Sequence, residues 1–223
     1  MESLRYAGLC LALGLIAVWA GENMFWFIPP ADLRLLDLAL TVIAYSIASG
    51  VGLTLVILSG VSGLPAAFLG GAVMGYMAEG VIVGTIYDPL PFFWVWTPLA
   101  WHALISGGLV LGLGRAGKAL GPARMALVWL ALGLASAFWA QYWPSEAKGP
   151  LPGTGTLAVY LMGFAVLVVL AHLGMDRLGH LPRPPTAVLW IAPGIAALVW
   201  VAQTVADLNP LRMLLPLVLA LLW

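Results

Sequence analysis

Charged residues are scarce in this sequence. Asp, Glu, Lys and Arg together make up 8% of its 223 residues, whereas soluble domains carry about 25% charged residues. A small soluble domain leaves much of its surface in water, so it could not hide the 63% of residues that are hydrophobic. With a mean hydropathy of +1.04, the composition excludes a soluble fold and predicts an integral membrane protein that has membrane lipid as its solvent.

Other features are missing as well, and each absence removes a class of function. The single cysteine, Cys10, excludes an intrachain disulfide and any CxxC metal or redox motif. The formal net charge is zero, which gives no basis for a nucleic-acid partner. The sequence has no phosphate-binding loop motif for nucleotide hydrolysis. It also lacks the alternation of polar and apolar residues that a transmembrane β-barrel requires.

Long hydrophobic runs fill the chain between short breaks rich in Pro, Gly and charge. A spanning helix needs about 20 mostly apolar residues, and the turn-forming segment from Ser59 to Pro65 divides one run that is too long for a single helix. We expect an all-α, polytopic transmembrane helix bundle in which residues 1–223 form a single domain. The apolar tail from Leu211 to Trp223 is too short for a full span and leaves open a short eighth segment. The seven predicted spans lie near residues 6–27, 38–59, 64–87, 93–114, 124–143, 155–175 and 186–206.

The positive residues give these spans an orientation. When the loops alternate between the two sides, six of the nine Lys and Arg residues fall on the side of the N-terminus and three on the opposite side. We name these the N-terminal side and the far side. Cytoplasmic loops carry an excess of positive charge, so we expect the N-terminal side to be cytoplasmic. The membrane would be the cytoplasmic (inner) membrane if the chain is bacterial.

The first residues permit a second interpretation. A positively charged start followed by apolar residues up to Ala20 is also typical of a signal peptide that is cleaved. We favour a true span because the apolar run continues through residues 21–27.

Polar side chains within the predicted spans gather in the far-side halves. Glu22 and Asn23 end the first span, Glu79 lies about two turns inside the third, and His102 lies at a similar depth in the fourth. Side chains three or four residues apart share one helix face, so each helix can direct its polar face toward a common point. We expect a polar, tryptophan-rimmed pocket that opens to the far side. Its predicted binding residues are Glu22, Asn23, Tyr76, Tyr87, Asp88, Trp101, Gln141 and Gln203.

Glu79 and His102 are the most informative of these residues. A charged acid in the middle of a membrane helix costs about 2.5–3.5 kcal/mol, so a carboxyl at this depth needs a partner. An imidazole at matched depth on the next span provides one, and we predict that the two side chains meet as an acid–base pair. For each residue alone, the alternative is a structural role as a hydrogen-bonded buried group. No metal ligand is predicted, because HxxxH and HxxE motifs are absent and His172 and His180 lie at the opposite end.

A second face of the third predicted span consists of small residues. Ala67, Gly71 and Gly75 recur every four residues, a spacing that lets a neighbouring helix approach closely. We therefore expect this span to be central, with Glu79 inside the bundle rather than facing lipid.

Two short segments carry a resemblance to known families. The stretch from Glu79 to Gly84, followed by Trp96 to Gly108, resembles the CAAX-type intramembrane peptidases, which carry a glutamate motif on one span and histidine motifs on later ones. Here Gly80 replaces the second glutamate, the arginine that follows is absent, and no second histidine lies at a usable depth. The same region resembles bacterial carotenoid-modifying membrane proteins, with shorter spacing. These departures leave the family unidentified, and no activity is carried over.

The predicted pocket points to a hydrophobic ligand. We expect the protein to bind or modify a hydrophobic small molecule such as an isoprenoid, a quinone, a pigment or a lipid, with Glu79 as the acid–base residue and His102 as its partner. A proton-coupled or cation transporter is one alternative, and it predicts a path that also reaches the N-terminal side. A structural or assembly subunit, bound to a partner membrane subunit, is the other. It predicts an empty, closed bundle with Glu79 bonded to a neighbouring helix or to the partner. The sequence identifies neither a cofactor nor a reaction.

Overall fold

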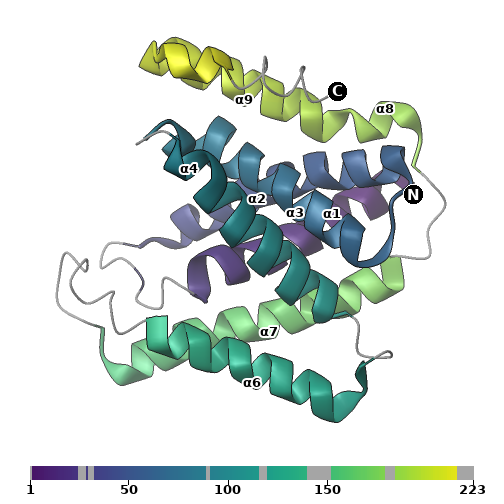
Figure 1. Cartoon of the computed structure of the whole chain (residues 1–223), viewed down its shortest axis with the longest axis vertical. Helices are drawn as coiled ribbons and strands as arrows, with labels where there is room; N and C mark the ends of the chain where they lie inside the picture. Colours follow the sequence, from purple (N-terminus) through teal and green to yellow (C-terminus); the bar gives the residue numbers. More distant parts are fainter. Residues whose placement is uncertain are drawn as a thin grey trace.

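The structure is a computed structural model of the chain, and all regular structure in its described part is helical (Figure 1). Predictions that concern Gln141, His180 and the tail beyond Leu214 fall outside this part. The described residues are 2–24, 29, 33–88, 91–115, 120–139, 152–178 and 184–214.

Seven helices in the described ranges are long and apolar enough to cross a membrane, which confirms the prediction of an integral membrane helix bundle. Their lengths of 18–25 residues match the thickness of the hydrocarbon layer. The seven helices are Glu2–Asn23, Leu35–Ser59, Gly63–Val83, Phe92–Leu113, Pro122–Trp139, Thr154–Leu178 and Thr186–Asp207.

Three of the seven helices change from α-helical to π-helical geometry along their length. The helix α1 (Glu2–Val18) continues as η1 (Trp19–Asn23), and α3 (Gly63–Tyr76) continues as η2 (Met77–Val83). The short α4 (Phe92–Val95) leads into the long π-helix η4 (Trp96–Leu113). π-helical turns are rare in proteins, and those that occur are often found at functional sites. Glu22, Glu79 and His102 lie in η1, η2 and η4 respectively, so the three π-helical segments hold the three titratable groups that the sequence singles out.

The remaining spans are α-helical, and two short helical turns follow spans on the far side. The 3₁₀ turn η3 follows the third span, and the 3₁₀ turn η6 follows the last span. These elements are α2 (Leu35–Ser59), α6 (Pro122–Trp139), α7 (Thr154–Leu178), α8 (Thr186–Leu189), α9 (Ile191–Asp207), η3 (Thr85–Tyr87) and η6 (Pro210–Met213).

Glycines set the ends of the second and third spans. Gly60 and Gly63 have positive φ angles of 69° and 68°, which form the predicted turn between α2 and α3. Gly84 has φ of 93°, and its N–H donates to the carbonyl of Glu79 at 2.9 Å. The third span therefore ends at Val83, and the predicted boundary at residue 87 is wrong. Glu79 lies about one turn inside this end rather than two, and Tyr87 does not share its helix.

The bundle is arranged around α1, α2, α3 and η4. The helix α9 packs on α2 and η2 along one side, and α7 packs on α1 on the other side, with α6 beside α7 (Figure 1). The N-terminus and α8 lie at one end of the bundle, to the right in Figure 1, and α4 lies at the other end. This arrangement agrees with helices that cross in alternating directions.

The small-residue face of α3 packs directly against η4. A Cβ atom on Gly75 would lie 2.7 Å from the carbonyl oxygen of Pro98 and 2.7 Å from Cβ of His102. A Cβ atom on Gly71 would lie 2.7 Å from the carbonyl oxygen of His102. Only glycine fits at these distances, so the prediction of a central third helix with a close neighbour is confirmed. The same contact places His102 beside the helix that continues to Glu79.

Candidate functional site

Glu79 and His102 meet between the third and fourth spans. Nε2 of His102 lies 3.0 Å from Oε1 of Glu79. The His102 side chain is 1% exposed and the Glu79 side chain 15% exposed. The predicted meeting of the two side chains is confirmed, and the close contact of Gly75 with η4 explains how the two helices bring them together.

The second oxygen of Glu79 binds a residue that the sequence did not single out. The hydroxyl of Thr85 donates a hydrogen bond to Oε2 of Glu79. Thr85 follows Glu79 by six residues, a spacing that would place the two on different faces of a continuous helix. The reversal of the chain at Gly84 brings them together, so helical periodicity carried no signal for this contact.

Glu22 has its own partner, which the sequence also did not indicate. The hydroxyl of Tyr45, on α2, donates to Oε1 of Glu22 at 2.7 Å. The ring of Tyr45 packs edge-on against the ring of His102, with centroids 6.0 Å apart. A Cβ atom on Gly21 would lie 3.1 Å from the Tyr45 hydroxyl and 3.3 Å from Cε1 of His102. The absence of a side chain at Gly21 therefore lets η1 approach both rings closely.

These contacts unite five side chains from five elements into one group. We refer to Glu22, Tyr45, Glu79, Thr85 and His102 as the acid–histidine cluster. Tyr45 joins Glu22 to this group, because its hydroxyl binds Glu22 and its ring packs on His102. In the part of the chain that the structure describes, no group of three or more His, Cys, Asp or Glu side chains could hold a metal ion.

Several buried polar atoms in the described residues lack a hydrogen-bond partner. They include Nδ1 of His102, Oγ of Ser106 and both side-chain amide atoms of Asn23. His102, Ser106 and Asn23 are at most 3% exposed. Leaving a buried polar group without a partner costs about 1–3 kcal/mol, so a native structure retains such atoms where they serve a purpose.

Three of the predicted binding residues donate hydrogen bonds to backbone carbonyls. Tyr76 donates its hydroxyl to the carbonyl of Trp94 at 2.9 Å, and Tyr87 donates to the carbonyl of Gly80 at 2.9 Å. Gln203 donates its amide to the carbonyl of Ile82 at 3.3 Å. Burial raises the pKa of the Tyr87 hydroxyl, so this group keeps the proton that it donates.

The other two described candidates lie apart from the acid–histidine cluster. Asp88 is exposed on the far side. Trp101 packs among aromatic rings, with centroids 6.2 Å from Trp96 and 5.5 Å from Trp139. Trp101 is therefore part of the apolar packing of η4 with α6 and α7, together with residues such as Leu132 on α6 and Val168 on α7.

A buried arginine lies at the far side of the bundle. Arg212, in η6, is 3% exposed and forms an ion pair with Asp207, with Nη2 2.6 Å from Oδ2. Its guanidinium carbon lies 5.3 Å from the centre of the Tyr87 ring, and a Cβ atom on Gly84 would lie 2.5 Å from its Nη2. In the sequence, Arg212 counts only as one of the three positive charges on the far side, because its burial depends on η6 folding back onto the turn at Gly84.

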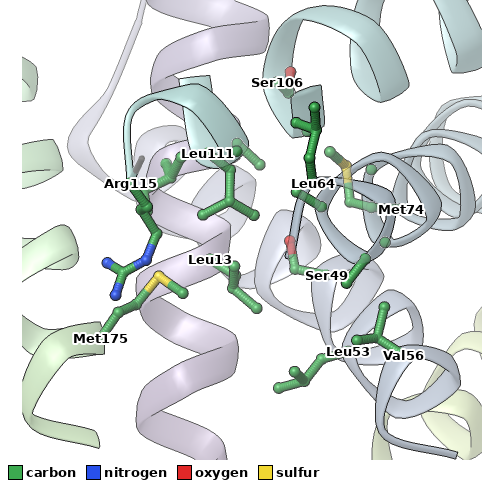
Figure 2. Close-up of a pocket in the computed structure, with 18 of the residues that line it drawn as sticks. Leu13, Ser49, Leu53, Val56, Leu64, Met74, Ser106, Leu111, Arg115 and Met175 are labelled. Atoms are coloured by element: carbon green, nitrogen blue, oxygen red, sulfur yellow. The ribbon is translucent and has the colours of Figure 1, made fainter. Parts of the chain in front are cut away.

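A cavity of about 510 Å³ lies in the half of the bundle nearer the N-terminal side (Figure 2). It opens on the N-terminal side near Leu64, which is 51% exposed, and Arg115. It follows α3 from Gly63 to Met74, a length of about 16 Å at the helical rise of about 1.5 Å per residue. The lining residues come from five spans and the segment after η4: Leu13, Ile16, Ala17, Ser49, Leu53, Val56, Gly63, Leu64, Ala66, Ala67, Gly70, Gly71, Met74, Ser106, Gly107, Leu111, Gly112, Leu113, Arg115 and Met175.

The inner end of this cavity approaches the acid–histidine cluster without including it. Ser106 lines the cavity and lies one helical turn from His102, and Gly71 lines it while contacting the backbone of His102. Neither Glu79 nor His102 is among the lining residues. The sequence predicted a pocket on the far side. Gln141, predicted at the far-side end of the fifth span, and the loop that follows it lie outside the described ranges, so the far-side pocket stays a prediction.

Comparisons of the chain with protein-family models, with curated proteins and with solved structures found no match. The functional conclusions therefore depend on the geometry of this chain alone.

Proposed function

We propose that this integral membrane protein binds a hydrophobic small molecule in the cavity near its N-terminal side. The volume of about 510 Å³ is the observation that carries this proposal, because ligand pockets commonly measure about 300–1,000 Å³. The lining is almost entirely aliphatic. Ser49, Ser106 and Arg115 are its polar side chains, and such isolated polar groups are what orients a ligand in an apolar pocket.

The shape of the cavity favours a slender ligand. Its length along α3 corresponds to about half of the hydrocarbon layer, which is about 30 Å thick. The walls include Gly71 and Gly107, where helices approach too closely for a bulky fused ring system to separate them. An isoprenoid chain, the tail of a quinone or a single acyl chain meets these requirements.

The acid–histidine cluster has a positioning role in this proposal. The bond between His102 and Glu79 fixes η4 against η2, and Ser106 follows on η4 one turn closer to the cavity. The unpartnered hydroxyl of Ser106 is the donor and acceptor that a ligand group at the inner end would satisfy. Acid–base chemistry by Glu79 and His102 requires the reactive group of the ligand to pass Ser106 and come within hydrogen-bond distance.

A cavity-filling substitution tests the proposal. A Cβ atom on Gly70 makes only an ordinary contact, 3.5 Å from Val56, so Gly70→Leu can fold and place its side chain in the cavity. Gly163→Leu is the matched control, because Gly163 is also helical and has nothing within 4 Å of its Cβ position. We expect native mass spectrometry to show retention of added farnesol, decylubiquinone or hexadecanol by the wild type and by Gly163→Leu, and loss of it in Gly70→Leu. Equal retention by Gly70→Leu contradicts the proposal.

A second candidate function, a proton-coupled carrier, is favoured by one observation. The transporter alternative predicts a path that reaches the N-terminal side, and the cavity runs from that side to within one turn of His102. Glu79 and Thr85 would then form the barrier between the cavity and the far side. A carrier predicts that Glu79→Gln abolishes pH-gradient-driven uptake in proteoliposomes while ligand retention persists. The assembly-subunit alternative predicts a closed bundle with Glu79 bonded to a neighbour or to a partner chain. Glu79 is bonded to His102, as this alternative requires, whereas an open cavity among the described helices does not fit a closed bundle.

A further inference from the structure

We propose that the ligand is an amphiphile with an anionic head group and that Arg115 holds this head group at the mouth of the cavity. This inference rests on the proposed function, because it assigns the chemistry of the ligand that the same cavity takes.

Arg115 is the cation among the described residues of the cavity wall. It follows η4, contributes to the lining and stands beside Met175 at the edge of the aliphatic surface (Figure 2). Its side chain is 31% exposed, so its guanidinium is accessible at the level where the cavity opens. A ligand whose apolar chain enters between α1, α2 and α3 therefore leaves its head group next to a fixed positive charge.

The guanidinium is held in place by α7 while keeping donors available. Its Nη1 donates to the carbonyl of His172 at 3.2 Å, and its Nη2 donates to Oδ1 of Asp176 at 2.5 Å. A guanidinium has five N–H donors in a planar fork that matches a carboxylate or a phosphate. The backbone bond to His172 orients the fork without neutralising it, and the remaining donors can bind an anion.

The carboxylate of Asp176 occupies the place that an anionic head group would share or take. The Asp176 side chain is 64% exposed, and exposed ion pairs contribute little net stability, so exchange with a ligand anion is inexpensive. Hydrogen bonds between a charged donor and a charged acceptor are shorter and about twice as strong as neutral ones. A carboxylate or phosphate head group thus gains more from Arg115 than a hydroxyl does.

Three ligands with chains of equal length distinguish the contribution of the head group to binding from that of the chain. The ligands are a fatty alcohol, a fatty acid and a lysophosphatidic acid, added to the purified full-length protein in an uncharged detergent. We expect Arg115→Gln to weaken binding of both anionic ligands about tenfold or more, since a hydrogen bond to a charged group contributes about 1.5–3 kcal/mol. Binding of the alcohol should change less than about twofold. Of the two anionic ligands, the one that the wild type binds more tightly identifies the head group as carboxylate or phosphate.

Controls distinguish failure of this inference from failure of the proposed function. Arg124→Gln removes another cation at the same end of the bundle, on α6 and outside the cavity lining, and should leave all three affinities unchanged. If the wild type binds the alcohol but Arg115→Gln weakens all ligands equally or none, the head-group assignment is wrong and the cavity proposal stands. If the wild type binds none of the three, the proposed function fails and this inference fails with it.

Discussion

Nε2 of His102 forms a hydrogen bond with Oε1 of Glu79 at 3.0 Å. This bond lies next to Gly75, where the backbones of α3 and η4 come into contact. A carboxyl at such a position is costly in lipid unless it is protonated or paired. The two features depend on one another. The close contact sets the distance, and the hydrogen bond offsets the cost of burying both polar groups.

Substitutions of Glu79 should separate charge from hydrogen bonding. Glu79→Gln keeps an oxygen for His102 and an amide for Thr85, so we expect a change in the free energy of unfolding below about 1 kcal/mol. Glu79→Ala removes a partner from buried His102 and should destabilise by about 3 kcal/mol or more. Asp88→Ala, at an exposed acid close to the same end, is the control and should have no effect. Unfolding midpoints in detergent provide the measurement, and equal losses for Gln and Ala at position 79 would contradict the pairing.

Gly75→Ala should disrupt the contact between α3 and η4. The added methyl group would lie 2.7 Å from the backbone oxygen of Pro98, and overpacking of this kind typically costs about 1–3 kcal/mol. Gly163→Ala adds the same methyl group where nothing lies within 4 Å, so it should be neutral or stabilising by about 0.5–1 kcal/mol. Thermal unfolding of the two variants beside the wild type tests this difference. Similar behaviour of the two alanine variants would show that the helices do not touch at Gly75.

The ion pair between Asp207 and Arg212 should respond asymmetrically to substitution. The Asp207 side chain is 46% exposed, whereas the Arg212 side chain is 4% exposed. Asp207→Ala leaves a buried cation without its partner and should cost about 3–5 kcal/mol. Arg212→Met leaves only a carboxylate that water can solvate, so its cost should be smaller.

The exposed pair of Arg34 and Asp37 offers a matched control for this asymmetry. The Arg34 side chain is 73% exposed, and Arg34→Met should change the free energy of unfolding by about 1 kcal/mol or less. All four proteins can be compared by chemical unfolding in the same detergent. A larger loss for Arg212→Met than for Asp207→Ala would mean that Arg212 acts through packing rather than through its charge.

The sequence predicts the spans well because span length and apolar composition are set by the bilayer itself. It also predicts the pairing of Glu79 with His102, because a buried acid needs a partner and the chain offers one at matched depth. The placement of Tyr87 in the third span is wrong, since a helical repeat of 3.6 residues does not include the π-helical turns or the reversal at Gly84. Contacts of Tyr45 with Glu22 and of Thr85 with Glu79 depend on these details of the backbone.

The position of the cavity could not be predicted for a different reason. The polar residues that suggest a pocket in the sequence gather in the far-side halves of the spans. The cavity is lined by residues such as Leu53, Val56 and Gly70, which resemble any lipid-facing segment. An apolar cavity forms where the side chains of five spans do not fill the space between them. Amino-acid composition alone does not predict how these side chains pack.

Photo-crosslinking with a hexadecanol analogue that carries a diazirine in its chain tests the central claim most directly. We expect labels on cavity residues such as Leu13, Leu53 and Met175, and competition by excess unlabelled hexadecanol should remove them. Labels on the exposed face of α6, at Leu127 and Leu134, report contact with bulk lipid and should resist competition. Saturable labelling confined to the cavity would establish it as the binding site. Labelling that is uniform over all exposed faces and insensitive to competitor would contradict the account.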